Sequence, residues 1–211
     1  IDALDKTSYH DFGKEVFPAV MRTHRVQVHL FDGYWEDIGT IRSFFEANLE
    51  LARSNPSYDL FDMGSPIFTR ARFLPPTRVD GATIKDSLLA DGCTIMPGAV
   101  IENSIIGLRC NVGPNAVIKN AIIMGNDYYE TPEELAELGP DVPPIGIGAG
   151  CHIEEAIIDK NCRLGENVTI VNEKKIQLTE ENQYGMIRDG VVCIPKETTL
   201  PSGWKLSEKI G

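Results

Sequence analysis

The sequence has little positive charge and no long apolar run. Its 211 residues include 20 Lys and Arg against 31 Asp and Glu, which gives a formal net charge of −11. This acidic balance argues against nucleic acid or an anionic membrane as the main partner. No apolar stretch approaches the roughly 18 residues that a membrane-spanning helix needs. We therefore expect no nucleic-acid partner and no membrane partner.

The sequence also lacks paired cysteines, because its five cysteines are odd in number and form no CxxC pair. An odd number without paired spacing favours neither a disulfide framework nor a zinc site, so the sequence predicts a reducing, cytoplasmic location. The chain opens at Ile1 rather than Met, and its first residues show neither the basic start nor the apolar core of a signal peptide. We expect it to be part of a longer protein.

Aliphatic residues recur at steps of five and six along the middle of the chain. This spacing is too long for the period of two of a strand and too irregular for a helix. One cycle of steps adds up to 17, so the pattern predicts that Ile84, Ile101 and Ile118 stack in successive turns of a coil. The aliphatic positions are Ile84, Leu89, Ile95, Ile101, Ile106, Val112, Ile118, Ile123, Ile147, Ile153, Ile158, Leu164 and Ile170.

A second column of small residues precedes each aliphatic position by two. Its members are Ala82, Ser87, Cys93, Ala99, Ser104, Cys110, Ala116, Ala121, Cys151, Ala156 and Cys162, with Val168 as a larger exception. A coil of three short sides needs one large and one small inward residue per side, and stacked coils pair their backbones about 4.8 Å apart. The pattern, over residues 79–171, resembles the hexapeptide-repeat family of left-handed parallel β-helices. Four of the cysteines then become structural core residues.

The repeat is interrupted over residues 126–146. Within the interruption, Thr131 followed by Pro132 and two acidic residues predicts the start of a short helix. Long insertions in a repeat structure often contain the functional site, although this one could equally be a covering flap.

Residues 1–54 do not follow the repeat. They predict a helix over 9–24 with a break or kink at Pro18, two strands over 26–31 and 34–38, and a helix from Ile41 capped by Thr40. A segment this short with so many aromatic residues cannot bury its own apolar face. We interpret it as the incomplete end of a larger α/β domain, followed by a Pro-rich linker over 55–78.

Seven short motifs, in the same order, make nearly the whole chain resemble one enzyme family, the ADP-glucose pyrophosphorylases (glucose-1-phosphate adenylyltransferases). The motifs are DFGKEVFP from Asp11, DGYWEDIGT from Asp32, FLPP from Phe73, DYYE from Asp127, IGIG from Ile145, AIIDKN from Ala156 and PSG from Pro201. The DYYE motif favours the plant and cyanobacterial branch. The resemblance implies the C-terminal half of the family's fold, namely the end of a Rossmann-like nucleotidyltransferase domain followed by a left-handed β-helix over 79–211.

The family makes ADP-glucose and pyrophosphate from ATP and glucose 1-phosphate, for glycogen or starch. Its glycine-rich nucleotide loop and its sugar-phosphate lysine region do not occur in this sequence, so the resemblance implies that the chain alone is inactive. The family's metal-binding aspartate matches Asp37. A carboxylate at a strand end suits Mg²⁺, and the resemblance makes Asp37 a magnesium ligand of the complete enzyme.

The family also binds phosphorylated effectors, such as 3-phosphoglycerate and inhibitory phosphate, between the β-helix and the linker. Phosphate sites need Lys and Arg that converge from separate segments. The resemblance places this site at Arg72, Asp159, Lys160 and Lys196. Arg70 stands where the plant pattern has glutamine and adds a further cation to the expected effector site, so the identity of the effector stays open.

Two other readings remain. A hexapeptide-repeat acyltransferase would need a surface histidine as general base, and His152 is the available residue in the repeat. A non-catalytic paralogue would keep the β-helix for regulation, although the presence of Asp37 argues mildly against it. The open edges of a β-helix favour self-association, and the resemblance implies a homotetramer.

Overall fold

The computed structural model describes residues 8–209 and divides into two compact units, Ile1–Trp35 and Glu36–Gly211. In the first unit, a π-helical turn η1 (Phe12–Val16) continues directly into the short helix α2 (Phe17–Val20). Asp11 caps this segment because its carboxylate accepts a hydrogen bond from the Lys14 N–H at 2.8 Å. The predicted helix is therefore present but ends at Val20, and Pro18 lies in the first turn of α2, where proline is tolerated.

The two strands predicted over 26–31 and 34–38 are wrong. Residues 25–39 form no strand in the part of the chain that the structure describes. A strand is stable only when its backbone N–H and C=O groups pair with a neighbouring strand. Val28 and Leu30, in the first of these expected strands, are 86% and 82% exposed.

The second unit is a stack of β-strand coils. Two sheets order the strands as β1-β4-β7-β9-β11-β15 and β13-β14-β10-β8-β5-β2, with β3, β6 and β12 pairing off this path. The strands are β1 (Arg78–Val79), β2 (Thr83–Lys85), β3 (Leu88–Leu89), β4 (Thr94–Ile95), β5 (Val100–Glu102), β6 (Ile105–Ile106), β7 (Asn111–Val112), β8 (Val117–Ile123), β9 (Gly146–Ile147), β10 (His152–Ile158), β11 (Arg163–Leu164), β12 (Thr169–Ile170), β13 (Met186–Arg188), β14 (Val191–Ile194) and β15 (Thr199–Leu200).

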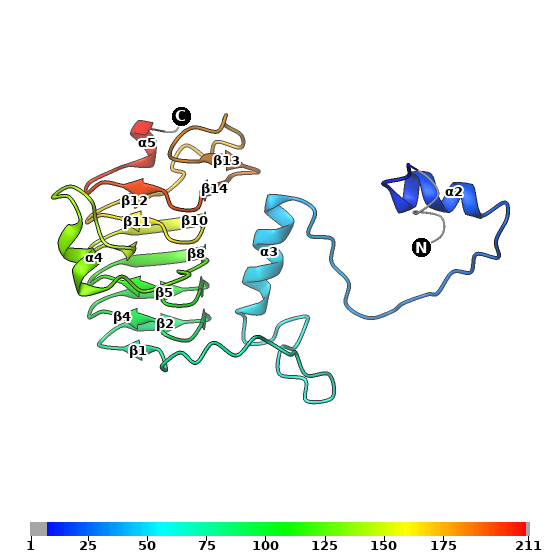
Figure 1. Cartoon of the computed structure of the whole chain (residues 1–211), viewed down its shortest axis with the longest axis horizontal. Coiled ribbons are helices and arrows are strands. Elements are labelled where there is room, and N and C mark those ends of the chain that lie inside the picture. Colours follow the sequence, from blue (N-terminus) through cyan, green and yellow to red (C-terminus); the bar gives the residue numbers. More distant parts are fainter. Residues whose placement is uncertain (1–7, 210–211) are drawn as a thin grey trace. The chain divides into compact units, whose positions relative to one another are not determined.

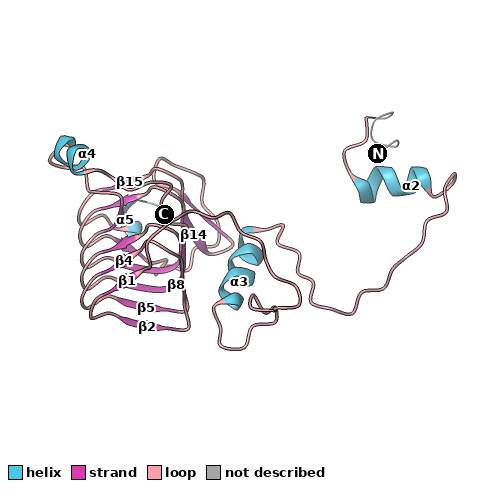
Figure 2. Ribbon diagram, turned by 60° about the horizontal axis from the view of Figure 1, so that its bottom comes forward, coloured by secondary structure: helices cyan, strands magenta, loops and turns pink. Residues whose placement is uncertain are grey.

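The register of the strands confirms the predicted stacking. Ile84 pairs with Ile101, which pairs in turn with Ile118, all in parallel strands. The second predicted column, Leu89 with Ile106 and Ile123, is confirmed in the same way. Figure 2 shows the strands of successive coils lying one above another. The sequence thus predicted the coil, its period and the residues that fill it.

The core of the stack consists of the two predicted columns. Most of the aliphatic positions and small residues are buried, while the first coil, with Ile84 and Leu89, is only partly covered. Cys93, Cys110, Cys151 and Cys162 are buried in the small-residue column, as predicted. Burial disfavours the charged thiolate and raises the pKa of Cys162 to about 12.

The coils extend beyond the predicted end of the repeat at residue 171. The chain leaves the stack after β12, forms the antiparallel pair β13–β14, and returns where Ile158 pairs with Ile194. Leu200 follows six residues later on β15, and Leu206 begins the short helix α5 (Leu206–Lys209). The steps of six between these residues repeat the aliphatic spacing. Residues 171–190 are a second insertion in the repeat, and they separate these residues from the earlier coils in the sequence.

Helix α3 (Ile41–Leu51) packs on the outside of the coils, against β8 and β14 (Figure 1). Its N-terminus has the predicted cap, in which Thr40 and Ser43 each bond to the backbone of the other. Phe45 and Leu49 are buried against outward-facing residues of the coils, Ile122, Ile157 and Val191.

The insertion over 126–146 carries the predicted helix, α4 (Pro132–Glu137), capped by Thr131. In Figures 1 and 2 it lies on a different side of the stack from α3. The insertion is tied down by Glu130, whose carboxylate lies 2.6 Å from Arg163 Nη1 and accepts a 2.7 Å hydrogen bond from the Ile145 N–H. Arg163 also donates to the Pro143 carbonyl at 3.0 Å. These contacts hold the insertion against the stack at its C-terminal end.

Candidate functional site

Two lysines from successive coils meet at one carboxylate. Lys160 Nζ lies 2.6 Å from Asp127 Oδ1, and Lys196 Nζ lies 2.9 Å from Asp127 Oδ2. The hydrogen bonds from Lys160 and then from Lys196 lower the pKa of the Asp127 carboxyl below its usual range, so it is ionised at neutral pH. The same carboxylate raises the pKa of Lys196. The predicted residues Lys160 and Lys196 therefore do converge, and they are bridged by an acid.

The backbone of Asp127 is held at the root of the insertion. Its N–H donates to Asn161 Oδ1 at 2.8 Å, and Asn161 Nδ2 lies 3.3 Å from the Asp127 carboxylate. The preceding Asn126 is buried and donates to the Arg109 carbonyl at 2.9 Å. Gly125 enters this turn with a φ of +79°, and a Cβ there would collide with the carbonyl of Leu108. The coil therefore fixes the backbone of Asp127, while its side chain is 38% exposed.

A cavity of about 490 Å³ lies between the linker and the cluster of Asp127 and Lys160. Arg70, Arg72 and Phe73 of the linker line it together with Arg109, and Asp127 and Lys160 complete the wall. The two predicted arginines therefore face the same cavity as one of the two predicted lysines. Five basic residues gather at this point of a strongly acidic chain, once Lys196 is counted through its bond to Asp127.

Arg109 is a member that sequence reasoning missed. It lies on a corner between β6 and β7 with a φ of +58°, and it donates to the Asn126 carbonyl at 3.2 Å. Its guanidinium also lies over the ring of Tyr129, 5.9 Å from the centroid. The only sequence signal is a single arginine in a corner of the repeat, which looks like any solvated surface residue.

Asp159 and Asp37 are placed differently from the cations. Asp159 does not line the cavity, and its Oδ1 accepts a hydrogen bond from the Lys160 N–H at 2.7 Å, which shapes the corner that presents the lysine. Asp37 precedes α3, where its Oδ1 accepts a 3.0 Å hydrogen bond from the Gly39 N–H. Residues 8–209 contain no cluster of three His, Cys, Asp or Glu side chains that could hold a metal. Asp37 thus fits a metal only as one oxygen ligand among several.

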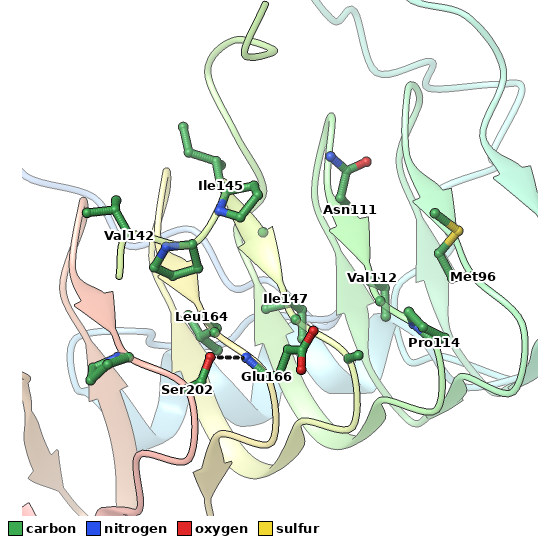
Figure 3. A pocket seen from close by; sticks show the side chains of 18 of the residues that line it. Met96, Asn111, Val112, Pro114, Val142, Ile145, Ile147, Leu164, Glu166 and Ser202 are labelled. Carbon is green, nitrogen blue, oxygen red and sulfur yellow. Dashed lines mark hydrogen bonds between the residues drawn. The ribbon is translucent and has the colours of Figure 1, made fainter. Parts of the chain in front are cut away.

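A larger cavity of about 690 Å³ lies between the insertion and one side of the coils (Figure 3). Val142 and Ile145 of the insertion line it with residues of β4, β7, β9 and β11, and the Glu166 N–H donates to Ser202 Oγ at 3.1 Å. No Lys or Arg lines this cavity, and its charged residues are Asp141 and Glu166. An anionic ligand is therefore disfavoured here.

His152, the base that an acyltransferase would need, lies exposed on β10. Its Nε2 is 3.7 Å from a carboxylate oxygen of Glu154 on the same strand. It lines neither the large cavity nor the arginine-lined one. Its nearest acidic partner is thus a neighbouring surface side chain.

Comparison with known proteins finds a match for each of the two parts of the chain. Residues 72–204 match the model of the GLGC left-handed parallel beta-helix domain, and residues 2–54 match the nucleotidyl transferase model. The chain belongs to the GLGC left-handed parallel β-helix domain family, the β-helix region of the glucose-1-phosphate adenylyltransferases. The family resemblance and the mainly parallel β fold predicted from the sequence are thus confirmed.

One similar protein is the glucose-1-phosphate adenylyltransferase small subunit of Triticum aestivum. It is 44% identical over 200 residues, which cover 92% of this chain and 42% of that protein. The chain therefore spans less than half the length of this relative. The relative is named as chloroplastic or amyloplastic, so the cytoplasmic location of this chain stays an expectation. None of the helices in residues 8–209 combines the length and the apolar character that a membrane span requires.

Proposed function

We propose that the chain is the regulatory and assembly half of a glucose-1-phosphate adenylyltransferase, which makes ADP-glucose and pyrophosphate from ATP and glucose 1-phosphate. The proposal also makes the arginine-lined cavity the binding site for a phosphorylated effector, such as 3-phosphoglycerate or inorganic phosphate. The observation that supports it is the convergence of Arg70, Arg72, Arg109, Lys160 and Lys196 from the linker and three coils.

The chemistry of these residues suits a phosphate. Guanidinium groups bind phosphate oxygens in pairs, and ammonium groups add compact positive charge. A single exposed cation is a weak anchor, but several that converge on one cavity attract an anion strongly even when the chain as a whole is acidic. No Lys or Arg lines the larger cavity, so these two cavities differ in the class of ligand that they suit.

Isothermal titration calorimetry with 3-phosphoglycerate and with phosphate tests the site. We expect Lys160→Ala/Lys196→Ala to weaken binding roughly 10- to 100-fold, because two charge-assisted hydrogen bonds are lost. The matched control is Lys85→Ala/Lys119→Ala, since these lysines also share one carboxylate, Glu102, at 3.4 and 3.7 Å. Equal affinities of the native chain and the Lys160→Ala/Lys196→Ala variant contradict the assignment.

For catalysis, we propose that Asp37 contributes one carboxylate oxygen to Mg²⁺ in the complete enzyme. The metal would neutralise charge on the triphosphate, while Asp37 supplies a hard oxygen ligand held in place by the Gly39 N–H. Millimolar Mn²⁺, used as a paramagnetic probe, should broaden the amide resonances around residue 37, and Asp37→Asn should abolish the effect. Equal broadening in both proteins argues against the assignment. We expect the chain alone to be inactive as a transferase, which an assay of ADP-glucose formation checks.

We also propose that the chain is a homo-oligomer, with a tetramer as the expected state. Strands β1 and β2 of the first coil lie at the ends of their sheets within residues 8–209, and Val79 of β1 is 47% exposed. Sedimentation equilibrium should give about four times the chain mass. A monomer at all concentrations contradicts this expectation. The acyltransferase alternative requires a reactive base, and the placement of His152 outside both cavities does not favour it.

A further inference from the structure

The carboxylate of Asp127 already occupies the two lysines at the arginine-lined cavity. Each carboxylate oxygen of Asp127 takes one lysine, Lys160 on Oδ1 and Lys196 on Oδ2. A phosphate group would present a similar pair of oxygens to the same two ammonium groups. We propose that Asp127 is a built-in competitor that occupies both lysines until a phosphorylated ligand displaces it. This inference rests on the proposed function, because it assumes that the lysines bind the ligand.

The geometry permits this displacement. The backbone of Asp127 is anchored by the N–H bond to Asn161, so the insertion can stay in place while the side chain turns away. The side chain is 38% exposed, and both lysine side chains are nearly half exposed. Ion pairs at this exposure contribute little net stability, so replacing the Asp127 carboxylate by a phosphate at the two lysines costs little free energy.

Because a ligand must bind the two lysines more strongly than Asp127 does, ligands with more than one negative charge are favoured. A monoanion such as acetate can only replace what Asp127 already provides at the two lysines. A phosphate dianion brings more charge, and it can also reach the guanidinium groups of Arg70, Arg72 and Arg109 in the adjoining cavity. Asp127 is therefore a residue that selects phosphorylated compounds over simple carboxylates.

A second lysine–carboxylate–lysine bridge in the chain shows what distinguishes this one. Glu102 joins Lys85 and Lys119, but at the longer distances of 3.4 and 3.7 Å. The hollow beside it is lined by Asp86 and Glu154 as well as by Arg53. Acidic neighbours there repel an incoming anion. Beside Asp127, the acidic residues Asp159 and Glu197 are outnumbered by the two lysines and the three arginines, so an anion is attracted.

The test is titration of the full chain with inorganic phosphate and with 3-phosphoglycerate. Asp127→Asn keeps the shape of the side chain and its contact with Asn161 but removes the charge that holds the lysines. We expect it to bind both ligands about 10-fold more tightly than the native chain. Asp127→Glu restores a competing carboxylate, so its affinity should lie within about 3-fold of the native value.

The matched control is Glu197→Gln, which removes the same charge beside Lys196. The exposed Glu197 carboxylate acts on Lys196 through space, whereas Asp127 accepts hydrogen bonds from both lysines, so we expect an affinity change below about 3-fold. Equal gains in Asp127→Asn and Glu197→Gln overturn the proposal, since net charge alone would then explain them. Unchanged or weaker binding by Asp127→Asn overturns it as well.

A measurement on the unaltered protein gives an independent check. The ¹³C resonance of the Asp127 carboxyl should shift when phosphate saturates the site, because the carboxylate loses both lysines. A resonance that does not move at saturation overturns the proposal. Failure of the proposed function is distinguished by the Lys160→Ala/Lys196→Ala variant, whose binding would then equal that of the native chain. If that variant loses binding while Asp127→Asn changes nothing, the site stands and only the competitor is wrong.

Discussion

Residues 26–30 and residues 117–123 both alternate or cluster apolar side chains, yet only the second segment is a strand. In β8, Ile118 is fully buried and pairs with Ile101 on one side and Ile153 on the other. In the first segment, Val28 is 86% exposed and forms no strand. The sequence patterns resemble each other, so the pattern alone does not make the strand.

This difference shows that an apolar pattern forms a strand only where a neighbouring strand is available to pair with its backbone. The repeat supplies each strand with a copy of itself 17 or more residues away, because every coil has the same three sides. The segment around Val28 has no such copy in the described chain. Residues 26–30 form no strand in the part of the chain that the structure describes, and Val28 and Leu30 are 86% and 82% exposed to solvent.

The largest effect should follow from breaking a strand within the repeat. Ile153 is fully buried between Ile118 and Ile170 of the neighbouring coils. We expect Ile153→Ala to lower the free energy of unfolding by about 2–5 kcal/mol, because the stacked column cannot collapse to fill the cavity. Urea denaturation followed by circular dichroism measures it. Ile153→Val serves as the control at about 1 kcal/mol, and equal losses in both variants would refute the stacked-core explanation.

A smaller and local effect should follow from loosening the insertion. The side chain of Glu130 is only 7% exposed and joins Arg163 to the Ile145 amide. Glu130→Gln should destabilise the closed insertion by about 2 kcal/mol, since an arginine loses its partner in a partly buried place. Hydrogen exchange of the Ile145 amide should then accelerate roughly 30-fold. The exposed Glu137 of α4 provides the control, and the same acceleration in Glu137→Gln contradicts the role of Glu130.

The two helix caps allow a comparison at the scale of about 1 kcal/mol. Thr40 caps α3, which buries Phe45 and Leu49 on the coils, whereas Thr131 caps α4, which buries no residue. Thr40→Ala should lower the free energy of unfolding by about 1 kcal/mol. Thr131→Ala should change it by only a few tenths of a kcal/mol, because α4 can fray without exposing the core. Thermal melts measure both, and equal shifts speak against this distinction.

The smallest effect should come from the unpaired segment itself. We expect Val28→Ala to change the free energy of unfolding by less than about 0.5 kcal/mol, because the side chain is already exposed. The same urea titration used for Ile153→Ala measures it. A loss above 1 kcal/mol would mean that residue 28 is buried in solution, and the contrast between the two segments would fail.

Much of the fold could be predicted because a repeat states its contacts several times over. The steps of five and six predicted the coil, its inward residues and the pairing of Ile84 with Ile101. Thr40 and Thr131 correctly predicted the starts of two helices. The prediction failed where the repetition stopped. Residues 171–190 interrupt the aliphatic spacing, so the last coil was not predicted from it. The alternating pattern around Val28 predicted a strand but could not identify a neighbouring strand for it to pair with.

The candidate site was only partly accessible to sequence reasoning. Lys160 and Lys196 were found through motifs of a known family, and the structure brings them to one carboxylate. The partner of both, Asp127, belongs to a quoted motif but gave no sign that it faces the lysines. Arg109 gave no signal at all, since a corner arginine of the repeat has the same local sequence whether it faces a cavity or water.

By itself, therefore, the sequence determined the period of the coil, its core and the family, because these depend on residues related by short, repeated spacing. Only the tertiary structure decided which charges meet. Lys160 follows Asp127 by 33 residues, and Lys196 follows Lys160 by 36. The stacking of coils, interrupted by two insertions, brings each lysine ammonium group within 2.9 Å of the Asp127 carboxylate. Electrostatic interactions depend on distance in space rather than along the chain, and that distance is set by the coil beneath the site.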